Sequence, residues 1–143
     1  MGDPTDYHAL LTGQQGEILW LPLLTGSMAP NIYPGELLKI TLCHKNEVQW
    51  GEVALFYREG KFTAHRIYMS SLWKGQKVYE KGDANSHGSW INRDRILGKV
   101  TGVKNDKGEF REIRKKPFFL LTSFVKMVLQ KIKNRIIRTF THD

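Results

Sequence analysis

The stretch Thr25-Gly26-Ser27-Met28-Ala29-Pro30 decides the fold of this chain, together with Gly35-Glu36 just after it. Gly26 lets the backbone bend before the serine, and Pro30 fixes the backbone after it, so the stretch predicts a tight turn. Apolar segments on both sides predict β-strands. Ser27 is therefore expected at the junction of two strands, where its hydroxyl is a candidate nucleophile.

The rest of the chain up to residue 113 is also organised as short strands. Alternating or apolar segments predict strands at Glu17–Leu24, Glu36–Leu42, Glu52–Tyr57, Lys61–Tyr68, Lys77–Lys81, Ile96–Val103 and Glu109–Ile113. Arg58-Glu59-Gly60 predicts a compact hairpin loop, and a short helix is expected at Tyr7–Leu11. The pattern alone predicts a mainly β protein with one small domain.

Length and composition exclude several classes of protein. A chain of 143 residues with 41% hydrophobic content fits one domain with a real core. Cys43 is the single cysteine, so no internal disulfide and no Cys-x-x-Cys zinc site is expected, and neither a cofactor nor a metal is predicted. The first twelve residues lack the basic region of a signal peptide, and no apolar run reaches the length of a membrane-spanning helix.

The positive charge is concentrated at the C-terminal end. From Ile113 onward there are eight Lys and Arg residues against Asp143 alone, which is +7 of the net +8 of the whole chain. The remaining residues are nearly neutral, and a nucleic-acid-binding domain would carry its own basic face. No nucleic-acid partner is therefore expected.

The segment after Pro117 changes its period from two residues to that of a helix. Its apolar positions are Phe118, Leu121, Val125, Val128, Ile132, Ile136 and Phe140, and most of its bases lie off this stripe. A basic amphipathic tail at 114–143 is predicted, following a catalytic domain at 1–113. The helix could pack on the domain, pair with another copy, or lie in a membrane interface with its bases toward anionic headgroups.

Two further motifs supply partners for the serine. His65 lies in Ala64-His65-Arg66-Ile67 on the return strand of the predicted hairpin, and Asp83 lies in Lys81-Gly82-Asp83-Ala84-Asn85. A serine hydroxyl needs a base within hydrogen-bond reach, and a histidine base is best oriented by a carboxylate. Ser27, His65 and Asp83 are therefore the candidate catalytic residues.

The order of the motifs resembles the superfamily of signal peptidases and self-cleaving LexA-type repressors. The resemblance runs from about Leu11 to Val103 and rests on Gly26-Ser27-Met28-Ala29-Pro30 with Gly35-Glu36, Gly51-Glu52-Val53, His65-Arg66-Ile67, Lys81-Gly82-Asp83-Ala84-Asn85 and Leu97-Gly98-Lys99-Val100. The histidine makes it similar to the Ser/His type of archaeal and endoplasmic-reticulum signal peptidases, since most bacterial members have a lysine there. The resemblance implies a small coiled antiparallel β domain.

The resemblance also implies roles for single residues. Ser27 would attack a peptide carbonyl, His65 would act as general base, and Asp83 would orient or support His65. The oxyanion would be held by the Ser27 backbone N–H and the Thr25 hydroxyl. Ser/His relatives usually carry a second aspartate at the position of Ser89, so the acid behind His65 stays open between Asp83, Asp94 and a Ser-His dyad.

The expected function is that of a serine endopeptidase of the signal-peptidase type, which cleaves a peptide or leader sequence in a peptide or protein substrate. The alternative is a catalytically silent module of the same fold that docks on a membrane surface or a partner protein. A third possibility, a self-cleaving regulator, is disfavoured because no helix-turn-helix segment precedes Ser27. The expected location is the cytoplasm, with the tail peripheral on the inner face of the cell membrane.

Overall fold

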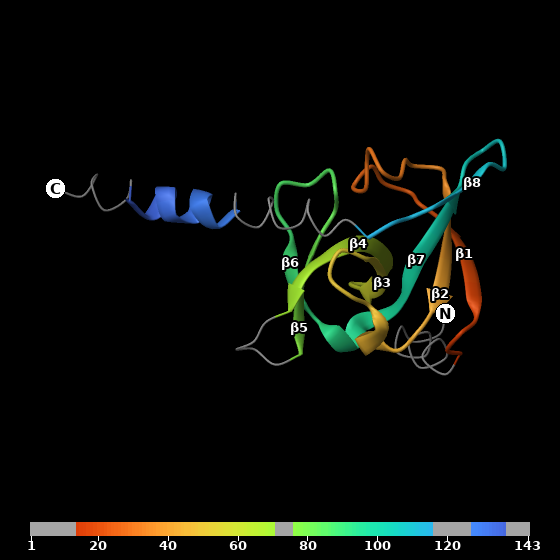
Figure 1. The fold of residues 1–143 in the computed structure, drawn as a ribbon, viewed down its shortest axis with the longest axis horizontal. Coiled ribbons are helices and arrows are strands. Elements are labelled where there is room, and N and C mark those ends of the chain that lie inside the picture. Colours follow the sequence, from red (N-terminus) through yellow and green to blue (C-terminus); the bar gives the residue numbers. More distant parts are fainter. Residues whose placement is uncertain (1–13, 71–75, 116–126, 137–143) are drawn as a thin grey trace.

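The structure is a computed structural model that describes residues 14–70, 76–115 and 127–136. Within these ranges eight strands form one open antiparallel sheet, as the sequence predicts for a mainly β protein (Figure 1). The strands are β1 (Ile18–Pro22), β2 (Leu37–Leu42), β3 (Val53–Arg58), β4 (Lys61–Ser70), β5 (Lys77–Lys81), β6 (Ser89–Asn92), β7 (Ile96–Lys104) and β8 (Phe110–Glu112). Their spatial order is β1-β2-β7-β3-β4-β5-β6, and β8 pairs with β7.

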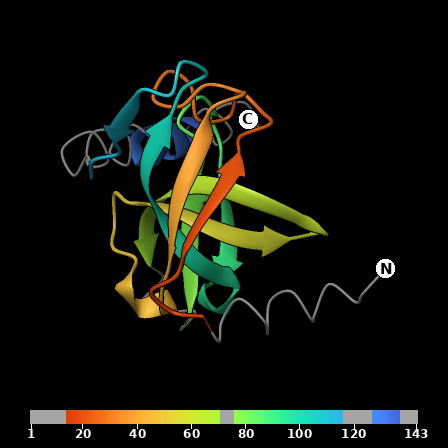
Figure 2. The same cartoon turned by 90° about the vertical axis from the view of Figure 1, so that its right-hand side faces the viewer.

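The strands of the sheet do not all run in the same direction. Figure 2 shows β1, β2 and β7 running side by side, while the hairpin of β3 and β4 crosses them at a steep angle. The pairing register shifts at Lys39/Ile40, Leu55/Phe56 and Ile67/Met69. Such bulges bend a strand and increase its twist, which accounts for the change of strand direction across the open sheet.

Strand β3 lies between two hydrophobic cores. Four successive residues, Val53 to Phe56, are buried, because side chains alternate between the two faces of the strand. Val53 and Leu55 belong to a core that includes Met28, whereas Ala54 and Phe56 belong to a second core with Ile67. The first core lies under the Ser27 turn, which therefore rests on packed side chains.

The predicted strands agree with the observed ones apart from their ends and one omission. Strand β6 was not predicted, because it has four residues of which only Ile91 is buried, so no alternation is visible. The predicted hairpin loop is confirmed, and both Glu59 (φ 52°) and Gly60 (φ 77°) have positive φ, as a two-residue turn between twisted strands requires. The expected helix at Tyr7–Leu11 lies outside the described residues.

The described part of the tail is a helix at 127–136, in agreement with the helical period of the sequence. Figure 1 shows this helix standing apart from the sheet. Every residue in it is exposed except Met127, which is half-buried. Within the described ranges, no helix has the length and hydrophobicity needed to span a membrane.

Candidate functional site

Ser27 lies in the loop that joins β1 to β2, and both ends of this loop are fixed by backbone hydrogen bonds. The Leu23 N–H donates to the Glu36 carbonyl at 2.9 Å, and the Gly35 N–H donates to the Leu23 carbonyl at 2.8 Å. Gly35 has φ +90°, a conformation that favours glycine. Met28, directly after Ser27, is completely buried in the first core. The turn thus presents Ser27 at the surface while its neighbour anchors the loop.

The Gly82-Asp83 motif contacts the Ser27 backbone directly. The Ala84 N–H donates to the Ser27 carbonyl at 2.9 Å. A Cβ at position 82 would lie 2.5 Å from that carbonyl oxygen and 3.0 Å from the Ser27 Cβ. Only glycine allows this close approach. The contact with Ser27 therefore explains why a glycine occupies position 82.

Asp83 is engaged by Arg66 and Asn31. Its Oδ1 accepts from Arg66 Nε at 2.9 Å, and its Oδ2 accepts from Arg66 Nη2 at 2.8 Å and from Asn31 Nδ2 at 2.7 Å. The side chains of Arg66 and Asp83 are only 1% and 2% exposed, so this is a buried ion pair. Arg66 Nη1 also donates to the Gly51 carbonyl at 2.6 Å. Asp83 therefore ties the Ser27 loop to β4.

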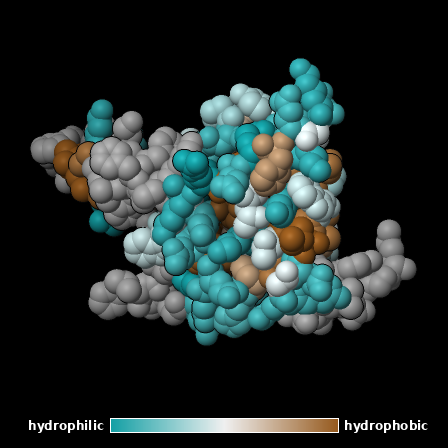
Figure 3. Space-filling model, turned by 45° about the vertical axis from the view of Figure 1, so that its right-hand side comes forward, coloured by the Kyte–Doolittle hydropathy of each residue, from teal (hydrophilic) through white to brown (hydrophobic). Residues whose placement is uncertain are grey.

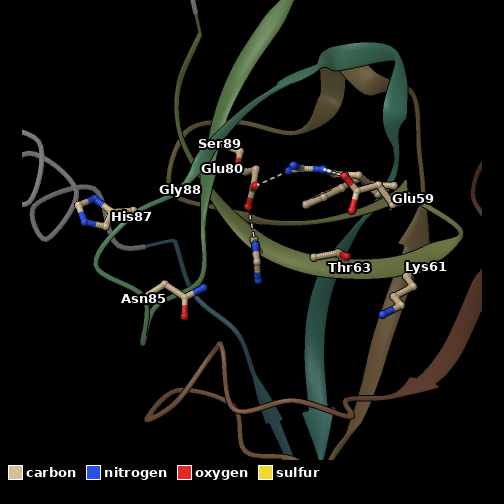
Figure 4. Close-up of a pocket in the computed structure, with 11 residues that line it drawn as sticks. Glu59, Lys61, Thr63, Glu80, Asn85, His87, Gly88 and Ser89 are labelled. Carbon is tan, nitrogen blue, oxygen red and sulfur yellow. Dashed lines mark hydrogen bonds and ion pairs between the residues drawn. The ribbon is translucent and has the colours of Figure 1, made fainter.

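The acidic partner of His65 is Glu80 rather than the expected Asp83. His65 Nδ1 and Glu80 Oε2 lie 2.5 Å apart, and the Glu80 side chain is 4% exposed. Arg58 Nη1 approaches the other oxygen of Glu80 at 3.4 Å. Figure 4 shows Glu80, with these two contacts drawn as dashed lines, at a polar pocket of about 260 Å³ that His87 also lines.

The pairing register explains why Glu80, not Asp83, meets the histidine. Glu80 on β5 is opposite Ile67 on β4, and side chains of opposite residues share one face. His65 is two residues from Ile67 and lies on that same face, whereas Arg66 lies on the other face with Asp83. Sequence reasoning missed Glu80. The sequence did contain a sign of it, because Glu80 is an acid two residues after the apolar Val78 and therefore on the same buried face of β5.

The other candidate acid, Asp94, lies elsewhere. It is in the short helical turn η2 (Arg93–Arg95) and forms an ion pair with Lys45, with its side chain 54% exposed. Ser89, where the resemblance implies a second aspartate, is directly opposite Glu80 in the β5–β6 ladder and lines the same polar pocket. The carboxylate that contacts His65 thus belongs to Glu80 on β5, and Ser89 is its partner on β6.

Ser27 and His65 line one cleft of about 810 Å³. Their side chains make no hydrogen bond with each other, and the Ser27 hydroxyl lies 3.1 Å from the Thr25 hydroxyl. The apolar lining includes Leu21, Leu23, Leu38, Leu55, Phe62 and Ala64. Among the described backbone groups, no carbonyl accepts from the Ser27 N–H. The cleft thus combines the Ser27 hydroxyl with the His65 imidazole. The Ser27 N–H and the Thr25 hydroxyl are two hydrogen-bond donors close to the Ser27 hydroxyl.

Two strand edges border this cleft. Among the described residues, β1 pairs only with β2, and the first half of β4, Lys61–His65, pairs only with β3. Their outer backbone groups can accept a further strand.

Lys81 braces the loop that contacts Ser27. Its ammonium group donates to the Asn85 carbonyl at 2.7 Å and to the Gly82 carbonyl at 3.2 Å. Burial lowers the pKa of Lys81, while the charge of Asp83 acts in the opposite direction.

Within the described part of the chain, no group of three or more His, Cys, Asp or Glu side chains could hold a metal ion. No protein-family model and no curated protein sequence matches this chain.

Proposed function

We propose that this protein is a serine endopeptidase of the signal-peptidase type, with Ser27 as nucleophile and His65 as general base. The observation that carries the proposal is that both side chains line one apolar cleft while the buried carboxylate of Glu80 contacts Nδ1 of His65. A carboxylate at Nδ1 favours the tautomer with its proton there and leaves Nε2 ready to accept one. The open antiparallel sheet and the motif order support the signal peptidase and LexA type of fold.

The proposed reaction uses groups on both sides of Ser27. As His65 Nε2 removes the hydroxyl proton, Ser27 Oγ attacks the peptide carbonyl and forms a tetrahedral oxyanion. The Ser27 N–H and the Thr25 hydroxyl donate to that oxyanion. His65 then gives the proton to the departing amine as the C–N bond breaks. Water hydrolyses the acyl-enzyme by the same route and restores the Ser27 hydroxyl.

The proposed substrate is an extended peptide segment. The free edges of β1 and of Lys61–His65 would supply backbone hydrogen bonds, as in other complexes formed by strand addition. Apolar side chains of the substrate would contact the lining of the cleft, which includes the buried Leu38 and Leu55. Specificity would then come from the residues on either side of the cleaved bond.

A degradomics experiment tests the activity without a known substrate. The protein is incubated with a complex peptide mixture, and new termini are identified by mass spectrometry. We expect new termini with the wild-type protein and with Ser86→Ala, an exposed serine in the neighbouring loop. Ser27→Ala and His65→Ala should produce none while unfolding in urea at the wild-type midpoint. New termini that persist in Ser27→Ala would refute the proposal.

A second candidate is a catalytically silent binding module of the same fold. It is favoured by the Ser27 hydroxyl contacting Thr25 and not His65. A serine-directed covalent probe separates the two functions, because labelling requires an activated hydroxyl. Labelling of Ser27 that is lost in His65→Ala supports the peptidase. A folded wild-type protein whose Ser27 is not labelled supports the binding module.

A further inference from the structure

The C-terminal helix at 127–136 exposes a set of large apolar side chains. Val128, Leu129, Ile132 and Ile136 are 36%, 58%, 49% and 50% exposed. Their spacing of three to four residues places them on one side of the helix. An isolated helix of this length is marginal in water, so an apolar side of this kind calls for a surface to cover it.

The polar residues of the helix lie on the opposite side or along the borders of the apolar one. At 3.6 residues per turn, Lys133 and Arg135 flank the apolar side on its two borders, and Lys131 lies farther round. Gln130 donates to Asn134 at 3.3 Å on the polar side. Figure 3 shows brown residues of this helix with teal residues on both sides of them. Apart from Met127, which at this spacing falls on the polar side, the helix is sorted by polarity around its axis.

The charge of this region selects among the surfaces that could cover the helix. Residues from Ile113 onward carry a net +7, so pairing with a second copy would bring two strongly positive segments together. A nucleic acid would neutralise the bases but would leave four aliphatic side chains in water. An anionic lipid surface satisfies both, because it takes up the aliphatic side chains below the headgroups and pairs the bases with phosphates.

We propose that the helix at 127–136 binds the interface of an anionic lipid membrane, with Val128, Leu129, Ile132 and Ile136 facing the acyl chains. Lys133 and Arg135 extend their apolar stems along the two borders and place their charges at headgroup level. The helix lies in the plane of the interface, so it holds the β domain and its cleft near the membrane surface.

Vesicle co-sedimentation of the full chain tests this proposal. Vesicles of phosphatidylcholine alone are compared with vesicles containing about one-third phosphatidylglycerol. We expect binding to the anionic vesicles at least tenfold stronger, and a loss of binding as salt shortens the range of the electrostatic attraction.

Two double variants with the same change in charge separate the apolar side from the net charge. Leu129→Glu with Ile132→Glu places two acids on the apolar side, whereas Gln130→Glu with Asn134→Glu places them on the polar side. Glutamate is a good helix former at all four positions. We expect the first variant to lose at least tenfold in affinity relative to the second.

Three results would overturn the proposal. They are equal binding to neutral and anionic vesicles, equal binding of the two double variants, and a dimer in analytical ultracentrifugation that only the apolar-side variant dissociates. Circular dichroism of each variant with vesicles verifies that the helix is intact. Because lipid binding is the readout, the result does not depend on whether Ser27 is a nucleophile.

Discussion

Replacing Glu80 by glutamine removes the charge that faces His65 and keeps the size of the side chain. The Nδ1 to Oε2 distance of 2.5 Å places the two charge centres of a carboxylate and a protonated imidazole roughly 4 Å apart. At an effective dielectric constant of about 20, that attraction is about 4 kcal/mol. In the proposed reaction His65 takes the Ser27 proton as the tetrahedral intermediate forms, so this energy would stabilise the transition state. We expect Glu80→Gln to lower the cleavage rate about 10³-fold.

Exchanging the two residues across the ladder gives a sharper form of the same test. Glu80 and Ser89 are direct partners on β5 and β6 and line the same polar pocket. Glu80→Ser alone should lose activity like the glutamine variant. Adding Ser89→Glu returns a carboxylate to the same face from the opposite strand, with composition and net charge unchanged. We expect this exchange to recover at least tenfold of the lost rate.

The assay is the rate of Ser27-dependent cleavage of a peptide identified in the degradomics experiment, measured for proteins with matched urea midpoints. Glu59→Gln is the control, because it removes an acid from the β3–β4 hairpin that carries His65. The Glu59 side chain is 81% exposed and contacts Arg58 at 3.8 Å. It should leave the rate within about twofold of wild type. If Glu80→Gln also stays within that range, Glu80 does not orient His65 and the reasoning is wrong.

Three other perturbations have defined outcomes. Asp83→Ala leaves Arg66 buried without its counter-ion, and urea unfolding should show a loss of about 3 to 5 kcal/mol; unchanged stability would contradict a bracing role. Thr25→Val removes one proposed oxyanion donor, so kcat should fall roughly 10²-fold with the fold intact, and an unchanged kcat would exclude the hydroxyl from the reaction. The hydrogen bond from Arg111 lowers the pKa of Glu36. This pair therefore stabilises the folded state at pH values above the ordinary glutamate pKa of 4.5. The stabilisation disappears as the pH falls through the lowered pKa. The free energies of unfolding of wild type and Glu36→Gln, measured in urea, should therefore differ by up to about 1 kcal/mol at pH 7 and converge in acid. A difference independent of pH would contradict this.

The sequence predicted the features that depend on local chemistry. Alternation of apolar residues predicted the strands around Ser27 and His65, and Gly60 marked the hairpin between β3 and β4. Helical spacing predicted the C-terminal helix, of which 127–136 is described. These features follow from side-chain direction and backbone freedom within a few residues, which the sequence shows directly.

Only the tertiary structure decided which acid meets His65. Asp83 and Glu80 are three residues apart, so both were available to the same region of the sheet, and the sequence favoured Asp83 through its motif. The register between β4 and β5 places Glu80 on the face of His65 and leaves Asp83 to Arg66 on the other face. Register is fixed by the whole set of strand pairs and bulges, and a shift of one residue moves a side chain to the opposite face. That long-range constraint is the physical reason why the carboxylate that contacts His65 could not be predicted from the sequence.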